Sequence, residues 1–179
     1  MYNGGMNLKP QDIYVALKIA AAGERRASYS QLGLELGMSP SEVHACVERA
    51  VTSHLLHPAD RQHRPNAAAL EEFLVHGLKY VFPADRGEPT RGVATSYGAK
   101  PLRALIAARD EAVPVWPHAA GRQRGVAMAP LHKSAPVAAL RDPAFYEYLA
   151  LADALRDGRV RERKLAQAEL HRRLRQKHA

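Results

Sequence analysis

The chain has 179 residues, of which 46% are hydrophobic and only 6% aromatic. This length fits one domain with an appendage or two small domains, and the apolar content is sufficient for a core. Strands favour β-branched and aromatic residues, so a composition led by Leu, Ala and Val predicts a mainly α fold. The single cysteine, Cys46, excludes an intramolecular disulfide and suits a reducing compartment.

The charge is uneven along the chain. The formal net charge of +8 favours an anionic partner, with nucleic acid as the first candidate. Residues 1–80 hold 8 Lys or Arg and 8 Asp or Glu, so they are neutral, whereas residues 81–135 and 136–179 each carry +4. Affinity for a polyanion is therefore expected to come mostly from beyond residue 80.

The sequence gives no sign of a membrane protein. The first residues, MYNGGMNLKPQD, have neither the positive start nor the apolar centre of a signal peptide. No stretch approaches the roughly 18 apolar residues of a membrane span. We therefore expect a cytoplasmic protein that does not contact a membrane.

Two helices are expected at the start of the chain. The first begins near Pro10, a residue suited to the first helical position, and ends at Gly23. The second runs from Tyr29 to Leu36 after a serine cap at Ser28 or Ser30. Gly37 ends it, because a residue just past a helix end commonly takes a positive φ that glycine adopts without strain.

A third helix follows this glycine turn at once. Ser39 is the expected cap, Pro40 occupies the first helical position, and Glu42 completes a capping box. An apolar stripe predicts the face turned to the core, formed by Val43, Cys46, Val47, Ala50 and Val51. Cys46 is then most simply a small core residue.

The next segment predicts a hairpin and a fourth helix. Leu55-Leu56 is a candidate short strand, residues 61–64 form a basic tip, and Asn66 caps a helix over residues 67–80. Helix, helix, turn, helix, hairpin and helix is the order of elements in a winged-helix domain. We therefore predict a winged helix-turn-helix domain in residues 1–80.

In a helix-turn-helix, the N-terminal residues of the second helix enter the major groove and contact base edges. The residues expected to read bases are Ser39, Ser41, Glu42, His44, Ala45, Glu48 and Arg49. Those expected to contact the DNA backbone, before the second helix or from the wing, are Arg25, Arg26, Ser28, Arg61, Gln62, His63 and Arg64. The alternative is a stable helical hairpin flanked by solvated loops.

Residues 10–80 resemble winged helix-turn-helix transcriptional regulators of the broad MarR-like kind. The resemblance rests on YSQLGLELGMSPSEVHACVERAVTSHLL and on the helix after the wing. It implies binding to double-stranded DNA, a homodimer formed by helices outside the winged domain, and repression of promoters. Only nine residues precede the first helix, and the long insert after residue 80 departs from this pattern. In general plan the remainder is closer to antitoxin-type regulators, which join a winged helix to a domain that binds a toxin.

Residues 81–179 are predicted to form a small mixed α/β or irregular unit followed by C-terminal helices. Residues 82–101 are expected to be a loop-rich connector, and residues 113–131 to be two extended arms around a turn at Ala120-Gly121. Helical segments are expected at residues 135–141, after Asp142-Pro143 and over residues 159–177. This unit is expected to serve dimerisation, partner binding or sensing.

Three arginines in this unit each precede a glycine and form a candidate anion or partner site: Arg86, Arg91 and Arg124. A guanidinium beside a flexible, uncrowded backbone can fork onto a phosphate or a carboxylate. Ordinary loop chemistry is the alternative. The basic last helix is open to a solvated role, a nucleic-acid contact, docking on an acidic protein, or a dimer contact through Leu170 and Leu174. Tyr97 and Trp116 are expected to be buried anchors rather than base-stacking residues.

Enzyme motifs are absent from the sequence. It contains no phosphate-binding glycine loop, no HExxH and no Gly-x-Ser-x-Gly elbow, and His54, His57 and His63 with Cys46 fit no zinc spacing. We therefore expect no catalysis, no cofactor and no metal. The sequence predicts a DNA-binding regulator, with an antitoxin or a winged-helix adaptor for protein contacts as alternatives.

Overall fold

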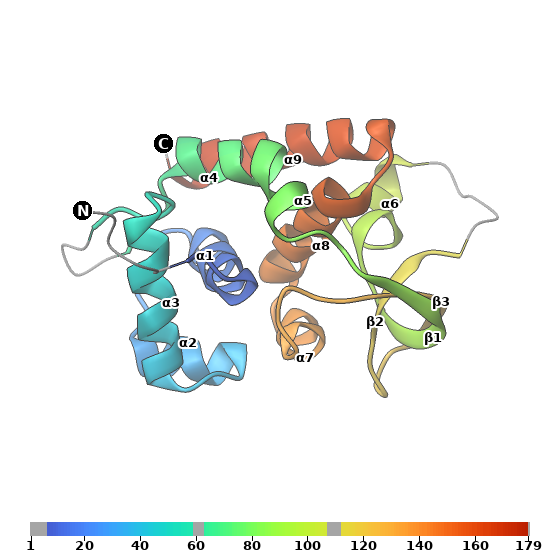
Figure 1. The fold of residues 1–179 in the computed structure, drawn as a ribbon, viewed down its shortest axis with the longest axis horizontal. Coiled ribbons are helices and arrows are strands. Elements are labelled where there is room, and N and C mark those ends of the chain that lie inside the picture. Colours follow the sequence, from blue (N-terminus) through green and yellow to red (C-terminus); the bar gives the residue numbers. More distant parts are fainter. Residues whose placement is uncertain (1–6, 59–62, 107–111, 179) are drawn as a thin grey trace.

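The structure, a computed structural model, is mainly helical with one small three-stranded sheet (Figure 1). It describes residues 7–58, 63–106 and 112–178. The helices are α1 (Pro10–Ala22), α2 (Tyr29–Leu36), α3 (Pro40–Thr52), α4 (Ala67–Glu72), α5 (Leu78–Val81), α6 (Leu102–Leu105), α7 (Ala135–Arg141), α8 (Pro143–Asp157) and α9 (Val160–His178). The strands are β1 (Arg86–Ala94), β2 (Pro114–Pro117) and β3 (Gln123–Met128).

The first three helices begin and end where their capping residues predict. Ser28 caps α2 by accepting a hydrogen bond from the Gln31 amide, and Ser39 caps α3 in the same way from the Glu42 amide. Gly37 takes the left-handed conformation, with φ 68°, between the two helices. The α2–turn–α3 segment is therefore confirmed as a helix pair around a glycine turn.

The predicted hairpin after α3 is short. Leu56 and Pro65 form one antiparallel bridge, and the His57 amide donates to the Arg64 carbonyl at 2.8 Å. Asn66 then caps α4 as expected. The predicted helix 67–80 is continuous through α4 and α5, with a π-helical turn at Phe73–Gly77 between them.

The central element is α1, which packs against α3 on one side and α8 on the other (Figure 1). All its residues from Asp12 to Ala21 are buried. Buried side chains from both sides of residue 80 belong to one hydrophobic cluster. The division of the chain at residue 80 stays a prediction about function, because packing does not separate the two segments.

The segment predicted as a loop-rich connector is instead the longest strand of the sheet, β1. It pairs antiparallel with β2 and with β3, while β2 and β3 share a short parallel pairing, so the three strands close on themselves. We call residues 86–106 and 112–128 the β module. The turn predicted at Ala120-Gly121 is confirmed between β2 and β3.

Glycines allow such a small sheet to close. A Cβ on Gly92 would overlap the carbonyl oxygen of Trp116, and a Cβ on Gly121 would overlap the backbone of Gly92. A Cβ on Gly125 would overlap the carbonyl oxygen of Val113. The glycines of the Arg91-Gly92 and Arg124-Gly125 pairs are therefore explained by strand closure.

A buried carboxylate anchors the β module to α8. Asp153 accepts hydrogen bonds from Thr95 Oγ1 at 2.7 Å and Trp116 Nε1 at 2.8 Å, and it pairs with Arg156 at 2.8 Å. Arg156 also donates to backbone carbonyls on either side of the module. Trp116 is buried as predicted. Tyr97 is half-buried, and its hydroxyl donates to the Ala112 carbonyl.

Two leucines of the last helix, α9, are not available for contact with a second chain. Leu170 and Leu174 are buried within this chain, where α9 packs against α8 and α4. The reading of these two leucines as a dimer contact is therefore wrong, because the intramolecular core already uses them.

We expect Gly121→Ala to lower the free energy of unfolding by about 3 kcal/mol, since the added methyl group overlaps fixed backbone. Gly87→Ala is the matched control. Its Cβ would lie 3.3 Å from the Cβ of Ala127 at an exposed position, and we expect a loss below about 1 kcal/mol. Urea denaturation of both variants measures the difference, and equal losses would contradict closure by glycine.

Candidate nucleic-acid interface

The inner face of α3 is fixed in the core. Val43, Cys46, Val47 and Ala50 are fully buried, as the apolar stripe predicts. Burial raises the pKa of the Cys46 thiol to about 12. The thiol is therefore a neutral core group.

Arg49 does not belong to the exposed face of α3, and its prediction as a base-reading residue is wrong. The side chain is buried and forms a bidentate ion pair with Asp12 of α1, with Nε···Oδ2 at 2.8 Å and Nη2···Oδ1 at 2.7 Å. A buried carboxylate needs such a partner, because an unpaired charge in the core is costly. Arg49 therefore joins α3 to α1.

The exposed face of α3 carries polar side chains and no cation. Ser41, His44 and Glu48 are exposed, and Ala45 is partly exposed between them. These residues follow one another at the spacing of a single helix face. They match the predicted base-reading set, and they form an uncharged to acidic surface.

Ser39 and Glu42 are exposed but already engaged with each other. The Glu42 carboxylate accepts from the Ser39 amide at 2.8 Å and from its hydroxyl at 2.7 Å. These hydrogen bonds hold the pKa of Glu42 below its usual value. Both residues therefore define where α3 begins, and a base contact from either has to compete with this capping box.

Three aromatic rings meet beside the exposed face of α3. The Tyr29 ring stacks on His63 with centroids 5.6 Å apart and meets the His44 ring edge-on at 5.2 Å. The Tyr29 hydroxyl lies 2.6 Å from His63 Nε2. Burial lowers the pKa of His63, which favours a neutral ring. The cluster joins α2 and α3 to the second arm of the hairpin.

The predicted backbone contacts differ in how exposed they are. Arg25 is held in a bidentate ion pair with Glu35, at 2.6 and 2.8 Å, so its guanidinium already has a partner. Arg26 and Arg64 are exposed and line one small pocket with His63. Ser28 is occupied as the cap of α2. Arg61 and Gln62 lie outside the described residues.

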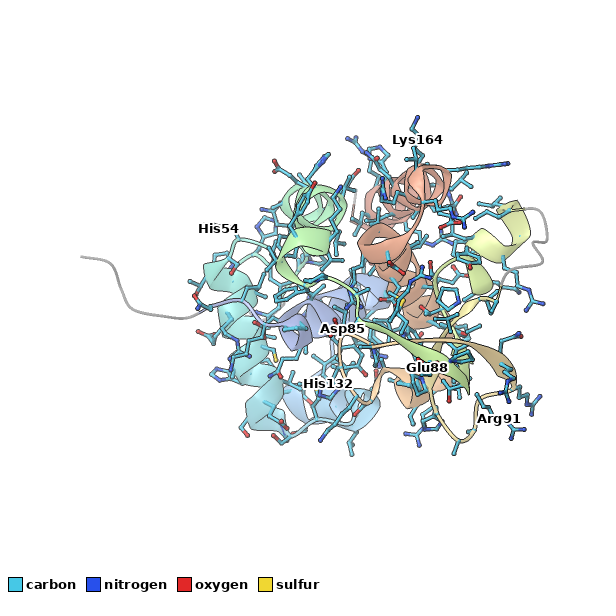
Figure 2. The ribbon with its side chains drawn as sticks, turned by 45° about the vertical axis from the view of Figure 1, so that its right-hand side comes forward. His54, Asp85, Glu88, Arg91, His132 and Lys164 are labelled. Atoms are coloured by element: carbon cyan, nitrogen blue, oxygen red, sulfur yellow. The ribbon has the colours of Figure 1, made fainter. Side chains whose placement is uncertain are left out.

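A cation beside the α2–α3 turn escaped sequence reasoning. The Ser134 hydroxyl contacts the Gly37 carbonyl at 3.4 Å, and a Cβ on Gly37 would lie 2.8 Å from Ser134 Oγ. His132 stacks on Tyr14 of α1, with ring centroids 5.0 Å apart, and Figure 2 shows it beside α2. Lys133 between them is exposed and lies near enough to Glu42 to influence its carboxylate. Residue 133 is far from residue 42 in the sequence, so only the packing of α7 on α2 brings them together.

The three arginines predicted as an anion site do not form one group. Arg86 pairs with Asp157 of α8, so it serves the attachment of β1. Arg91 and Arg124 lie opposite each other in the pairing of β1 with β3, and both are exposed. Part of this prediction therefore stands as a juxtaposition of two arginines.

Within residues 7–58, 63–106 and 112–178, no three His, Cys, Asp or Glu side chains lie close enough to hold a metal ion. Among the helices of the same part of the chain, none is long and apolar enough to cross a membrane.

Comparison of the chain with protein-family models, with curated proteins and with solved structures found no match. The MarR-like resemblance stays a prediction, and the function has to be argued from the geometry.

We expect Asp12→Asn to lower the free energy of unfolding by about 3–5 kcal/mol, because it leaves the Arg49 guanidinium buried without a counter-charge. Glu48→Gln on the exposed face of α3 is the control, with an expected change within about 0.5 kcal/mol. Urea denaturation provides the measurement. An Asp12→Asn variant that keeps full stability would contradict the role of this ion pair in the core.

Stability should also depend on pH through Glu35. Hydrogen bonding to Arg25, and further contacts with Lys18, lower the pKa of Glu35 to about 2. A depressed carboxyl pKa adds stability above the unfolded-state value of about 4.3, and this stability is lost as the pH falls through 2. We expect Glu35→Gln to flatten the stability profile between about pH 5 and 2, by about 1–2 kcal/mol after solvent screening. Thermal denaturation across this range tests the prediction. A Glu35→Gln variant whose stability falls as steeply with acid as that of the wild type would contradict the ion pair.

Proposed function

We propose that this chain is a sequence-specific DNA-binding transcriptional regulator, which acts in the cytoplasm as a homodimer. In this proposal α2, α3 and the hairpin at residues 55–66 form a winged-helix reading head. The observation that supports it most is the arrangement of α3, whose inner face is buried in the core while its polar outer face is exposed. Reading the major groove requires a helix held in this way.

The outer face of α3 divides into two roles. Ser41 and His44 can donate to base edges, and the Ala45 methyl group suits contact with a thymine methyl group. Glu48 can accept from a cytosine amino group. Ser39 and Glu42 hold the start of α3 in place through their capping box. Specificity is therefore assigned to Ser41, His44, Ala45 and Glu48.

Affinity has to come from cations around this face, because phosphate contacts dominate binding to DNA. Arg26 and Arg64 on one side and Lys133 on the other are exposed and flank the pair of helices. A second copy of the chain doubles the number of these contacts, which supports the homodimer in this proposal. A regulator that covers a promoter in this way acts as a repressor.

We expect Ser41→Ala combined with His44→Ala to reduce the preference for the target sequence over random duplex by tenfold or more, through lost base contacts. Both side chains are exposed, so the fold should be unaffected. Arg26→Gln is the contrasting variant. It should weaken binding to all sequences alike and leave the preference unchanged, since phosphates carry no sequence information.

Selection of bound duplexes from a random library supplies the target, and titration at fixed salt then gives the preference of each variant. The failure of the wild-type chain to enrich any sequence would refute sequence-specific regulation. Equal loss of preference in Arg26→Gln and in the α3 variant would place base reading elsewhere.

A further inference from the structure

The β module exposes two arginines that face each other without a counter-charge. Arg91 of β1 is the register partner of Arg124 of β3. Like charges directly opposite each other in an antiparallel pair are destabilising. Within the described residues, neither guanidinium pairs with a carboxylate. Figure 2 shows Arg91 at the outer side of the module, on the far side of the molecule from α3.

Several other arginines of the chain have carboxylate partners. Arg25, Arg49, Arg86, Arg156 and Arg173 each form an ion pair with a carboxylate. The pairing of Arg86 with Asp157 shows that β1 itself has a carboxylate within reach at its other end. Within the described residues, β1 thus carries one arginine with a carboxylate partner, Arg86, and one without, Arg91.

An open groove of about 510 Å³ lies beside this pair and adds two more arginines. Arg103 from α6 and Arg122 from the turn before β3 line it, together with Tyr146 and the backbone of Gly92. The lining residues include no carboxylate. Neither Arg103 nor Arg122 forms an ion pair in the described part of the chain. Arg103 and Arg122 thus line the groove, and Arg91 and Arg124 adjoin it through their strand neighbours Gly92 and Gln123, which also line it.

This surface suits a polyanion better than a protein. A protein interface depends on a central cluster of buried apolar or aromatic anchors, whereas the charged groups are the main feature here. The closed pairing of the three strands also leaves little edge for a peptide strand to join. The guanidinium group of arginine can donate two parallel hydrogen bonds to phosphate oxygens and carries the opposite charge.

We propose that Arg91, Arg124, Arg103 and Arg122 form a second DNA-binding surface, which grips the phosphodiester backbone of a duplex without reading its sequence. This inference rests on the proposed function and deepens it. In Figure 1 the β module and α3 lie at opposite ends of the molecule, so the duplex segment on this surface is not the one that α3 reads. The surface supplies affinity that the neutral reading head lacks.

The test measures how binding to a random 30-base-pair duplex changes with salt. The logarithm of the binding constant falls with the logarithm of salt concentration by about 0.9 for each phosphate contact. We expect Arg91→Gln with Arg124→Gln to reduce this slope by about 2. Their melting temperature should not fall, because the substitution removes a repulsion between like charges.

A matched control removes the same charge elsewhere. Arg161→Gln with Lys164→Gln changes two exposed residues of α9, and Figure 2 shows Lys164 well away from Arg91. We expect this pair to leave the slope unchanged. An unchanged slope in the Arg91 and Arg124 variant overturns the proposal. Equal reductions in both variants also overturn it, since net charge alone would then explain the effect.

Two further outcomes separate this inference from the proposed function. A wild-type chain that binds random duplex through Arg91 and Arg124 but enriches no sequence supports this surface and refutes the sequence-specific regulator. A wild-type chain that enriches a sequence, together with an unchanged salt slope in the Arg91 and Arg124 variant, supports the sequence-specific regulator and overturns this surface. Polyglutamate that competes with DNA for the wild-type chain, but not for the Arg91 and Arg124 variant, supports an anion site at this surface. A wild-type chain that binds polyglutamate and no duplex assigns the surface to an acidic protein and overturns the proposal.

Discussion

The burial of α1 from Asp12 to Ala21 is the constraint on which the rest of the structure depends. This helix carries two charged residues into the core, and each needs a partner because an isolated charge cannot be buried cheaply. Asp12 forms an ion pair with Arg49 of α3. Lys18 lies within 2.7 Å of both Glu35 of α2 and Asp142, the residue that caps α8. Three helices are thus placed relative to α1 by ion pairs whose loss would leave an uncompensated charge in the interior.

This constraint also shapes the surface that α3 presents. Because Arg49 neutralises Asp12, α3 keeps no basic side chain on its exposed face, which holds Glu42 and Glu48 instead. In the proposed role, this face of α3 discriminates between sequences but gains little from the phosphates. In that role the phosphate-contacting cations come from other segments, and the contact of Ser134 with Gly37 places Lys133 beside the turn.

Local signals explain what the sequence could predict. The bounds of α2 and α3 follow from Ser28, Gly37 and Ser39, since caps act within a few residues of the helix they begin or end. The partner of Arg49 is a distant contact, although Asp12 lies four residues before Ala16 on the apolar face of the first helix and thereby signals a buried charge. The sequence predicts a loop where β1 lies because the glycines and proline of this segment are typical of turns. Their purpose appears only when three strands close around Gly92 and Gly121.

The two candidate DNA surfaces differ in the physical reason for their exposure. The face of α3 is exposed because a helix needs only one apolar side to be held in the core, so exposure there is the ordinary state of a polar face. The exposure of Arg91 opposite Arg124 is different, because the pairing of β1 with β3 sets two like charges side by side at a cost in stability. A fold that pairs its other strand arginine with Asp157 has the means to avoid this cost. The pairing of Arg91 with Arg124 is therefore the stronger indication that an anion outside the chain binds at this surface.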